Sequence, residues 1–282
     1  MFSHLIVPVY SWAVSTQAVR VAADLAAATG ATLDLVAVTA YPEDRVATAN
    51  MLTSIVVAHG PLPVEPTQHV DIAASVSEAV AARFAAADDA LIVMNSHGRG
   101  RVASVLGSTA TELLAATGAP IVVVGPNAGD QPTRVDGTYI IPLDGSERGD
   151  GILPVVADWA RGFGGDPVLV EVIDPDADVP DDVTPEAVVA TRAKWLGDEL
   201  GRTAIEYDTL RDERPGRAIL DFAERRDASL VFMATHGRTC VARLRAGSVA
   251  ADVVRHATCP VVMFRPRDLA APDTDAETPR PA

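Results

Sequence analysis

The sequence repeats itself along its 282 residues, and this repetition limits the possible folds more than any other feature. Matching segments are separated first by 134 residues, then by 139 and finally by 140: 5–11 with 139–145, 91–99 with 230–238, and 119–124 with 259–264. Short identities recur inside these segments, such as His-Gly-Arg after the apolar runs that end at Met94 and Met233. We therefore predict a tandem duplication of one folding unit.

Each copy alternates short apolar runs with segments of helical periodicity, which indicates an α/β fold whose parallel sheet is covered on both faces. Five strands are expected in each copy: near 5–9, 33–38, 64–70, 91–95 and 121–125, and near 138–143, 167–173, 203–210, 230–234 and 261–265. Helices are expected where apolar residues recur every three or four positions. In the first copy the recurring residues are Ile72, Val76, Val80 and Phe84. In the second copy they are Ile219, Phe222 and Ala223, with Arg226 at the solvent edge.

The composition indicates where the two domains end and excludes several classes of protein. The segment 125–137 is rich in glycine, proline and aspartate, so we predict domains over 1–127 and 135–266, followed by a disordered, proline-rich tail over 267–282. The formal net charge of −15 disfavours nucleic acid and anionic membranes as partners. The first residues do not resemble a signal peptide, and the two cysteines do not suggest a disulfide framework or a metal site. We expect a soluble, cytoplasmic protein.

The loop after the fourth strand of each copy has the features of an anion site. It contains Gly98 in the first copy and Gly237 in the second, where backbone can approach a ligand closely, and it ends at Gly107-Ser108 and Gly247-Ser248. Each serine is a good N-cap residue for a following helix, whose first N–H groups attract anions. The loops are basic and lack acidic residues: His97, Arg99 and Arg101 in the first, and His236, Arg238, Arg243 and Arg245 in the second. Phosphate contact and simple solvent exposure are both open for these arginines.

The turn after the first strand of each copy would form the opposite wall of such a site. In the second copy Asp144 follows the strand, where an aspartate accepts hydrogen bonds from ribose hydroxyls or helps to hold Mg²⁺. The Asp-Gly-Ser sequence also suits a turn or a helix cap, so this alternative stays open. In the first copy Tyr10 occupies the same position, so the two copies differ chemically.

These residues resemble the universal stress protein family in its tandem-domain form. ATP-binding members of that family carry G-x2-G-x9-G-[ST] after the fourth strand and an aspartate after the first. The second copy matches this pattern with Ala234 in place of the first glycine, and the resemblance implies an ATP site, with or without Mg²⁺. Its residues are Pro142, Asp144, Val172, Met233, Ala234, Gly237, Arg238, Gly247, Ser248 and Val249.

The first copy departs from the family pattern at three points. Asn95 replaces the first glycine, and the spacer from Arg99 to Leu106 holds eight residues instead of nine. Tyr10 replaces the aspartate, where it either fills part of the adenine pocket or stacks on the base. We expect the second copy to bind ATP and the first to bind it weakly or not at all. The residues of this degenerate site are Pro8, Val38, Met94, Gly98, Arg99, Gly107 and Ser108.

The resemblance implies two Rossmann-like (adenine nucleotide alpha hydrolase-like) domains, each with a five-stranded parallel sheet, that associate through their last strands within one chain. A homodimer of the whole chain is also compatible with it. The implied function is that of a nucleotide-dependent stress-response sensor or regulator. The alternatives are a scaffold protein that needs no nucleotide, and a slow ATPase or autophosphorylating protein with Ser248 near the phosphates. We assign no catalytic residue and no metal ligand, because no general base is positioned by the sequence and the loop histidines suit structural hydrogen bonds.

Overall fold

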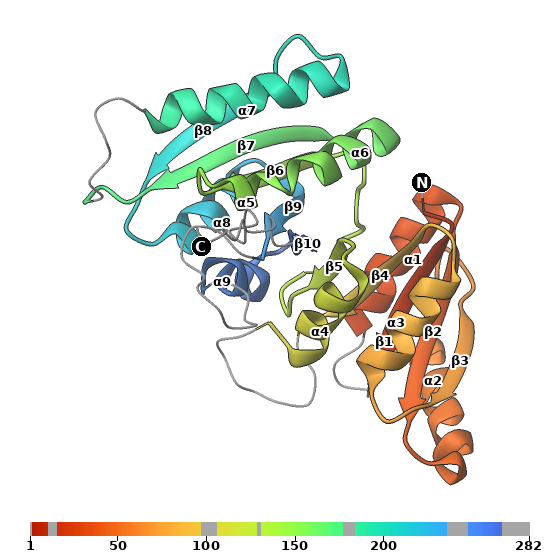
Figure 1. Ribbon diagram of the computed structural model, residues 1–282. Coiled ribbons are helices and arrows are strands. Elements are labelled where there is room, and N and C mark those ends of the chain that lie inside the picture. Colours follow the sequence, from red (N-terminus) through yellow and green to blue (C-terminus); the bar gives the residue numbers. More distant parts are fainter. Residues whose placement is uncertain are drawn as a thin grey trace, which may run out of the picture.

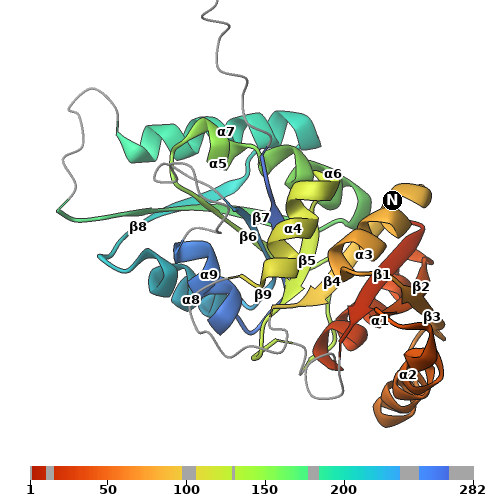
Figure 2. The same ribbon diagram turned by 60° about the horizontal axis from the view of Figure 1, so that its bottom comes forward.

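The computed structural model (Figures 1 and 2) describes residues 2–10, 16–96, 106–128, 131–176, 184–235 and 248–266. Ten strands form one sheet in the order β3-β2-β1-β4-β5-β10-β9-β6-β7-β8. In the first half the strands are β1 (His4–Val9), β2 (Thr32–Thr39), β3 (Thr67–Ile72), β4 (Ala90–Asn95) and β5 (Ile121–Val124). In the second half they are β6 (Thr138–Leu143), β7 (Asp166–Ile173), β8 (Glu206–Arg211), β9 (Ala228–Ala234) and β10 (Val261–Phe264).

The two halves of the sheet meet at β5 and β10. These two strands pair antiparallel, with Val122 opposite Val262, and every other pair of neighbouring described strands is parallel. The register repeats with the sequence: Leu5 lies opposite Leu91, and Tyr139 lies opposite Leu230. Two five-stranded parallel sheets are thus joined edge to edge through their last strands.

The helices cover both faces of this sheet. Those of the first half are α1 (Thr16–Thr29), α2 (Arg45–His59), α3 (Val76–Ala86) and α4 (Ser108–Thr117), and a 3-10 turn η1 (Pro42–Asp44) precedes α2. Those of the second half are α5 (Glu147–Asp150), α6 (Leu153–Phe163), α7 (Pro185–Leu200), α8 (Pro215–Arg225) and α9 (Ser248–His256). One core joins α1, α2, α6 and α7 to the sheet, and the other joins α3, α4, α8 and α9 (Figures 1 and 2). Apolar strand residues alternate between these two cores, as the period of two requires.

The strand predictions are confirmed, with shifts at β3 and β8. The expected strand over 64–70 begins only at Thr67, which pairs with Asp34, because the preceding Pro66 has no N–H to donate. The helix expected from Ile72 onward was wrong at its start. Ile72 is the last residue of β3, and α3 begins after Ser75, whose hydroxyl accepts a hydrogen bond from the Glu78 amide.

The segment between the two halves is anchored to both of them. The Thr133 amide donates to the Asp24 carboxylate at 2.8 Å, and the Tyr139 hydroxyl donates to the Val135 carbonyl oxygen. Burial raises the pKa of Asp24, and the Thr133 hydrogen bond acts in the opposite direction. The expected tail over 267–282 and its disorder lie outside the described residues, and the domain boundaries stay a prediction.

Candidate functional site

The expected nucleotide residues of the second half gather at one edge of the sheet. Parallel strands end at the same edge, and β6 lies between β7 and β9, so the carboxyl ends of these three strands are neighbours. Asp144 follows β6 directly, Val172 lies near the end of β7, and Ala234 ends β9. The fold therefore brings together segments that are far apart in the sequence.

The carboxylate of Asp144 is fixed by the turn that follows it. Its Oδ1 accepts a hydrogen bond from the Ser146 amide at 3.1 Å and another from the Ser146 hydroxyl at 2.6 Å. Ser146 in turn caps α5, since its hydroxyl oxygen accepts from the Gly149 amide at 3.0 Å. A Cβ atom on Gly149 would lie 2.5 Å from Asp144 Oδ1, so glycine is needed for this approach. The turn role that the sequence left open for Asp144 is thus present at Oδ1.

Arg192, on α7, holds the same turn from the side and was not predicted from the sequence. Its Nη2 donates to the Gly145 carbonyl oxygen at 3.2 Å, and its Nε donates to the Asp150 carboxylate. The side chain is only 15% exposed, and a bond from Nη1 to the Val188 carbonyl oxygen fixes it further. The turn and α7 are far apart in the chain, so local sequence gives no signal for this contact.

The apolar members of the expected site face the same side of the sheet. Met233 is buried in the core that α8 and α9 cover, and Val172 and Val249 pack against that core as partly buried side chains. Pro142 is half-buried within β6. These side chains offer an apolar surface beside the Asp144 turn, of the kind that small-molecule sites use.

The basic part of the expected site is only partly described. Ser248 begins α9 and is exposed, which places it where the first N–H groups of that helix are available. Gly237, Arg238 and Gly247 lie outside the described residues, as does His236. Their contribution stays a prediction.

In the first half, Tyr10 occupies the position equivalent to Asp144 and contacts the neighbouring helix. Burial raises the pKa of its hydroxyl to about 12, a hydrogen bond with the Thr109 side chain lowers it, and the charge of Glu112 raises it. Thr109 and Glu112 belong to α4, so the tyrosine side chain connects the end of β1 to the beginning of that helix. The aspartate of the second half has no counterpart in this arrangement.

Asn95 also has a structural task in the first half. Its Oδ1 accepts a hydrogen bond from the Ala18 amide at 3.2 Å, and this bond is buried, so the side chain satisfies a donor in the first turn of α1. A glycine cannot do this. The structure places Pro8, Val38 and Met94 on the strands equivalent to those of the second half, and Gly107 and Ser108 at the start of α4. Gly98 and Arg99 lie outside the described part of the chain.

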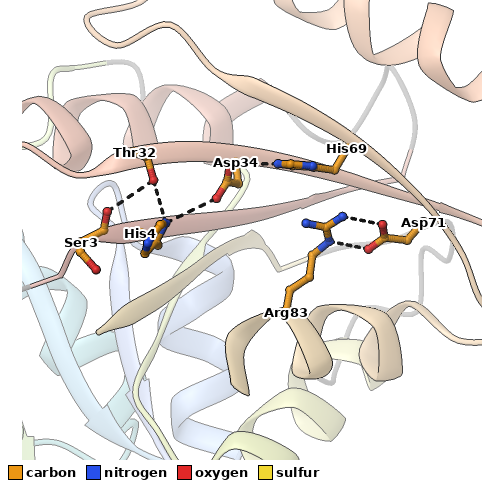
Figure 3. A network of polar contacts seen from close by, with 7 residues as sticks. All are labelled: Ser3, His4, Thr32, Asp34, His69, Asp71 and Arg83. Carbon is orange, nitrogen blue, oxygen red and sulfur yellow. Dashed lines mark hydrogen bonds and ion pairs between the residues drawn. The ribbon is translucent and has the colours of Figure 1, made fainter. Parts of the chain in front are cut away.

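A separate cluster of titratable side chains lies in the first half (Figure 3). His69 Nε2 is 3.0 Å from Asp34 Oδ1, and His4 Nδ1 is 3.8 Å from Asp34 Oδ2. Arg83, on α3, donates two hydrogen bonds to Asp71, on β3. His4 begins β1, whereas Tyr10 follows its end, so the histidine cluster lies away from the carboxyl edge.

At three positions of this cluster the second half has apolar residues. Val168, Leu210 and Phe222 stand where the first half has Asp34, Asp71 and Arg83, and all three lie in or against the core. The cluster is therefore one of two ways to fill this part of the fold. Within the described residues, neither this cluster nor any other group of histidine, cysteine, aspartate and glutamate side chains has a geometry that could hold a metal ion.

Comparisons with known proteins agree with this architecture. Residues 138–265 match the model of the universal stress protein family. A universal stress protein of Mycolicibacterium smegmatis is 31% identical over 185 residues, which cover 63% of this chain and 62% of that protein. The chain thus aligns with less than two thirds of the length of this curated relative.

Two solved structures are also similar. A universal stress protein of Pseudomonas aeruginosa shares 18% identity at a TM-score of 0.62, and the alignment covers 94% of each chain. A universal stress protein of Archaeoglobus fulgidus in complex with dAMP aligns with 45% of this chain and 94% of its own, at 22% identity and a TM-score of 0.33. The first likeness shows the fold alone, a helix-covered, mostly parallel sheet of Rossmann-like type. In the described part of the chain, no helix is long and apolar enough to cross a membrane.

Proposed function

Because this chain is a member of the universal stress protein family, we propose that its second half binds ATP at the carboxyl edge of β6, β7 and β9. The observation that carries this proposal is the Asp144 carboxylate. Two hydrogen bonds from Ser146 hold it at the end of β6, at the same sheet edge as Val172 and Ala234. A fixed carboxylate at that edge is well placed to accept hydrogen bonds from a ribose.

The remaining residues fit the parts of such a nucleotide. Pro142, Val172 and Met233 supply the apolar side on which adenine would lie, with Ala234 small enough to let the base approach. Gly237, Arg238, Gly247, Ser248 and Val249 belong to the loop and helix start that would hold the phosphates, with or without Mg²⁺. This basic segment offsets the repulsion that a triphosphate meets from a chain of net charge −15.

The same proposal makes the two halves unequal. Tyr10 and Asn95 are engaged in contacts that support the fold of the first half, so we expect one nucleotide per chain. Domains over 1–127 and 135–266 would then have separate tasks: the second binds the nucleotide, and the first serves as its structural partner through β5 and β10. A cytoplasmic regulator whose state follows the nucleotide is the function that this arrangement supports best. Homodimerisation of the chain adds nothing that the site needs.

Equilibrium dialysis of the purified chain with radiolabelled ATP tests this proposal. We expect about one ATP per chain for the unaltered protein and loss of binding for Asp144→Ala. Asp158→Ala, which removes an exposed carboxylate on α6, serves as the matched control and should bind normally. No binding to the unaltered protein would favour a scaffold that needs no nucleotide, and two ATP per chain would contradict the unequal halves. Release of ADP or a phosphorylated Ser248 would instead support the alternative of slow hydrolysis or autophosphorylation.

A further inference from the structure

A surface groove runs between α8 and α9 on the outer side of the second half. It has a volume of about 710 Å³, which lies in the range of ligand sites. The first turn of α8 forms one wall, and α9 from Ser248 to His256 forms the other. The two helices approach closely at Gly216, where a Cβ atom would collide with the Asp252 carboxylate.

The rim of this groove is basic, although the chain as a whole is acidic. Arg214, Arg217 and Arg255 line it together with His256, whose Nδ1 lies 3.0 Å from Oδ1 of Asp252, the single carboxylate among the lining residues. Among the described residues, no carboxylate forms an ion pair with Arg214, and the pair of Arg217 with Asp221 spans 3.7 Å with both side chains more than half exposed. The groove therefore has a surplus of positive charge in a chain of net charge −15.

The first half shows that the fold does not need these cations. Helices α3 and α4 are the counterparts of α8 and α9 and pack together in the same way, with Ser77 donating to the Glu112 carboxylate at their contact. The positions equivalent to the four basic residues are Ser75, Glu78, Ala115 and Ala116. One helix pair is thus stable without a basic rim, so the packing of the two helices does not require it.

The floor of the groove is apolar. Pro215, Leu220 and Val249 line it between the basic side chains, and Val249 and Leu220 continue into the core below. A ligand that fills it would combine negative charges for the rim with apolar groups for the floor. A peptide with alternating acidic and apolar side chains has this chemistry, and exposed arginines on two separate helices suit an extended chain better than one compact anion.

From this complementarity we propose that the α8–α9 groove is the docking site for an acidic segment of a partner protein that also carries apolar side chains. The groove does not include Asp144, but it shares Ser248 and Val249 with the start of α9 that would hold the phosphates. A docked segment would therefore lie next to the proposed phosphate position. Nucleic acid is disfavoured as the occupant, because a phosphate backbone has no apolar side chains to place on the floor of Pro215, Leu220 and Val249.

Fluorescence anisotropy with a labelled peptide of glutamates interspersed with leucines tests the proposal. We expect saturable binding at low salt that weakens as salt is added. The combined variant Arg214→Ser, Arg217→Gln, Arg255→Ala and His256→Ala should bind at least about tenfold more weakly, because it loses the charged rim. The control variant Arg20→Ser, Arg45→Gln and Arg211→Gln removes the same number of exposed arginines elsewhere and should bind normally.

Several results would overturn the proposal. They are the absence of peptide binding, equal binding of a peptide with glutamine in place of glutamate, equal binding by the combined variant, and tighter binding of a labelled single-stranded oligonucleotide. Circular dichroism of each variant establishes that it is folded. Peptide binding by Asp144→Ala, and ATP binding by the combined variant, separate a failure of this proposal from a failure of the nucleotide proposal.

Discussion

Arg83 donates two hydrogen bonds to the Asp71 carboxylate, from Nε at 2.5 Å and from Nη2 at 2.6 Å, and this pair joins helix α3 to the edge strand β3 (Figure 3). The Arg83 hydrogen bonds lower the pKa of Asp71, and partial burial opposes them. The folded-state pKa therefore lies below the unfolded value of about 3.9. The stability that the pair contributes is fully present above the unfolded pKa and is lost as pH falls through the folded pKa.

The first prediction concerns acid stability. Asp71→Asn should lower the free energy of unfolding by about 1–3 kcal/mol at neutral pH, because a charge-assisted pair becomes a neutral one. The loss should shrink as the pH falls below about 4, where the unaltered protein also becomes protonated at this site. Urea unfolding followed by circular dichroism at a series of pH values measures both effects. A difference between the two proteins that stays constant down to pH 2 would show that the Asp71 charge is not the cause.

The second prediction uses the second half of the chain as a template. Leu210 and Phe222 occupy the positions of Asp71 and Arg83 there and pack against the core. Each single change, Asp71→Leu or Arg83→Phe, should cost about 2 kcal/mol or more, because it leaves a partly buried charge without its partner. The double variant should recover most of that loss, since apolar pairs replace ion pairs of this kind at little cost.

A double-mutant cycle in urea at neutral pH measures the recovery as a coupling free energy. Purely additive losses in the double variant would mean that the environment of β3 and α3 differs from that of β8 and α8 despite the shared fold. Arg226→Ala, which affects an exposed pair with Glu206, provides a reference for ordinary surface charge.

The third prediction concerns Arg192 as a positioning residue. Arg192→Met keeps most of the buried aliphatic length but removes the bonds to the Gly145 carbonyl oxygen and to Asp150. The turn that holds Asp144 should become less ordered, and ATP should bind about tenfold more weakly with the stoichiometry unchanged. Arg202→Met is the matched control, because Arg202 makes a similar bond to the Gly165 carbonyl oxygen at the opposite end of the sheet.

Equilibrium dialysis and thermal unfolding together distinguish positioning from stability in this case. Loss of stability with unchanged ATP affinity would assign Arg192 to the fold alone. Equal weakening of ATP binding by the Arg202 variant would show a general effect of losing a buried arginine instead of a local effect on the Asp144 turn.

The fold was predictable from the sequence because its signals are local and repeated. Short apolar runs located the ten strands of the described residues, with shifts at β3 and β8. The start of α3 was wrongly predicted at Ile72, because this strand residue lies four positions before Val76 and so continues the spacing of the helix residues. Periodicity alone does not separate the end of a strand from the start of a helix when only a short turn lies between them.

The candidate site was predictable only in part, because some of its contacts join distant segments. The position of Asp144 followed from a match of motifs, whereas its restraint by Arg192 depends on how α7 packs over β7 and β8. The basic rim of the α8–α9 groove was missed for the same reason. Arg214 and Arg255 are far apart in sequence and meet only because the helices after β8 and β9 are neighbours.

The last prediction concerns Tyr10 at alkaline pH. Burial raises the pKa of its hydroxyl to about 12, above the unfolded value of about 10. The unfolded chain therefore ionises first, so the free energy of unfolding should fall as pH rises from about 10 toward 12. In Tyr10→Phe this contribution is absent. The free energy of unfolding should therefore decrease less between about pH 10 and 11, by about 1 kcal/mol or less. Tyr139, whose pKa burial also raises, keeps its share in both proteins. Urea unfolding at closely spaced alkaline pH values measures the difference, and identical profiles would mean that Tyr10 is open to solvent and does not close the first site.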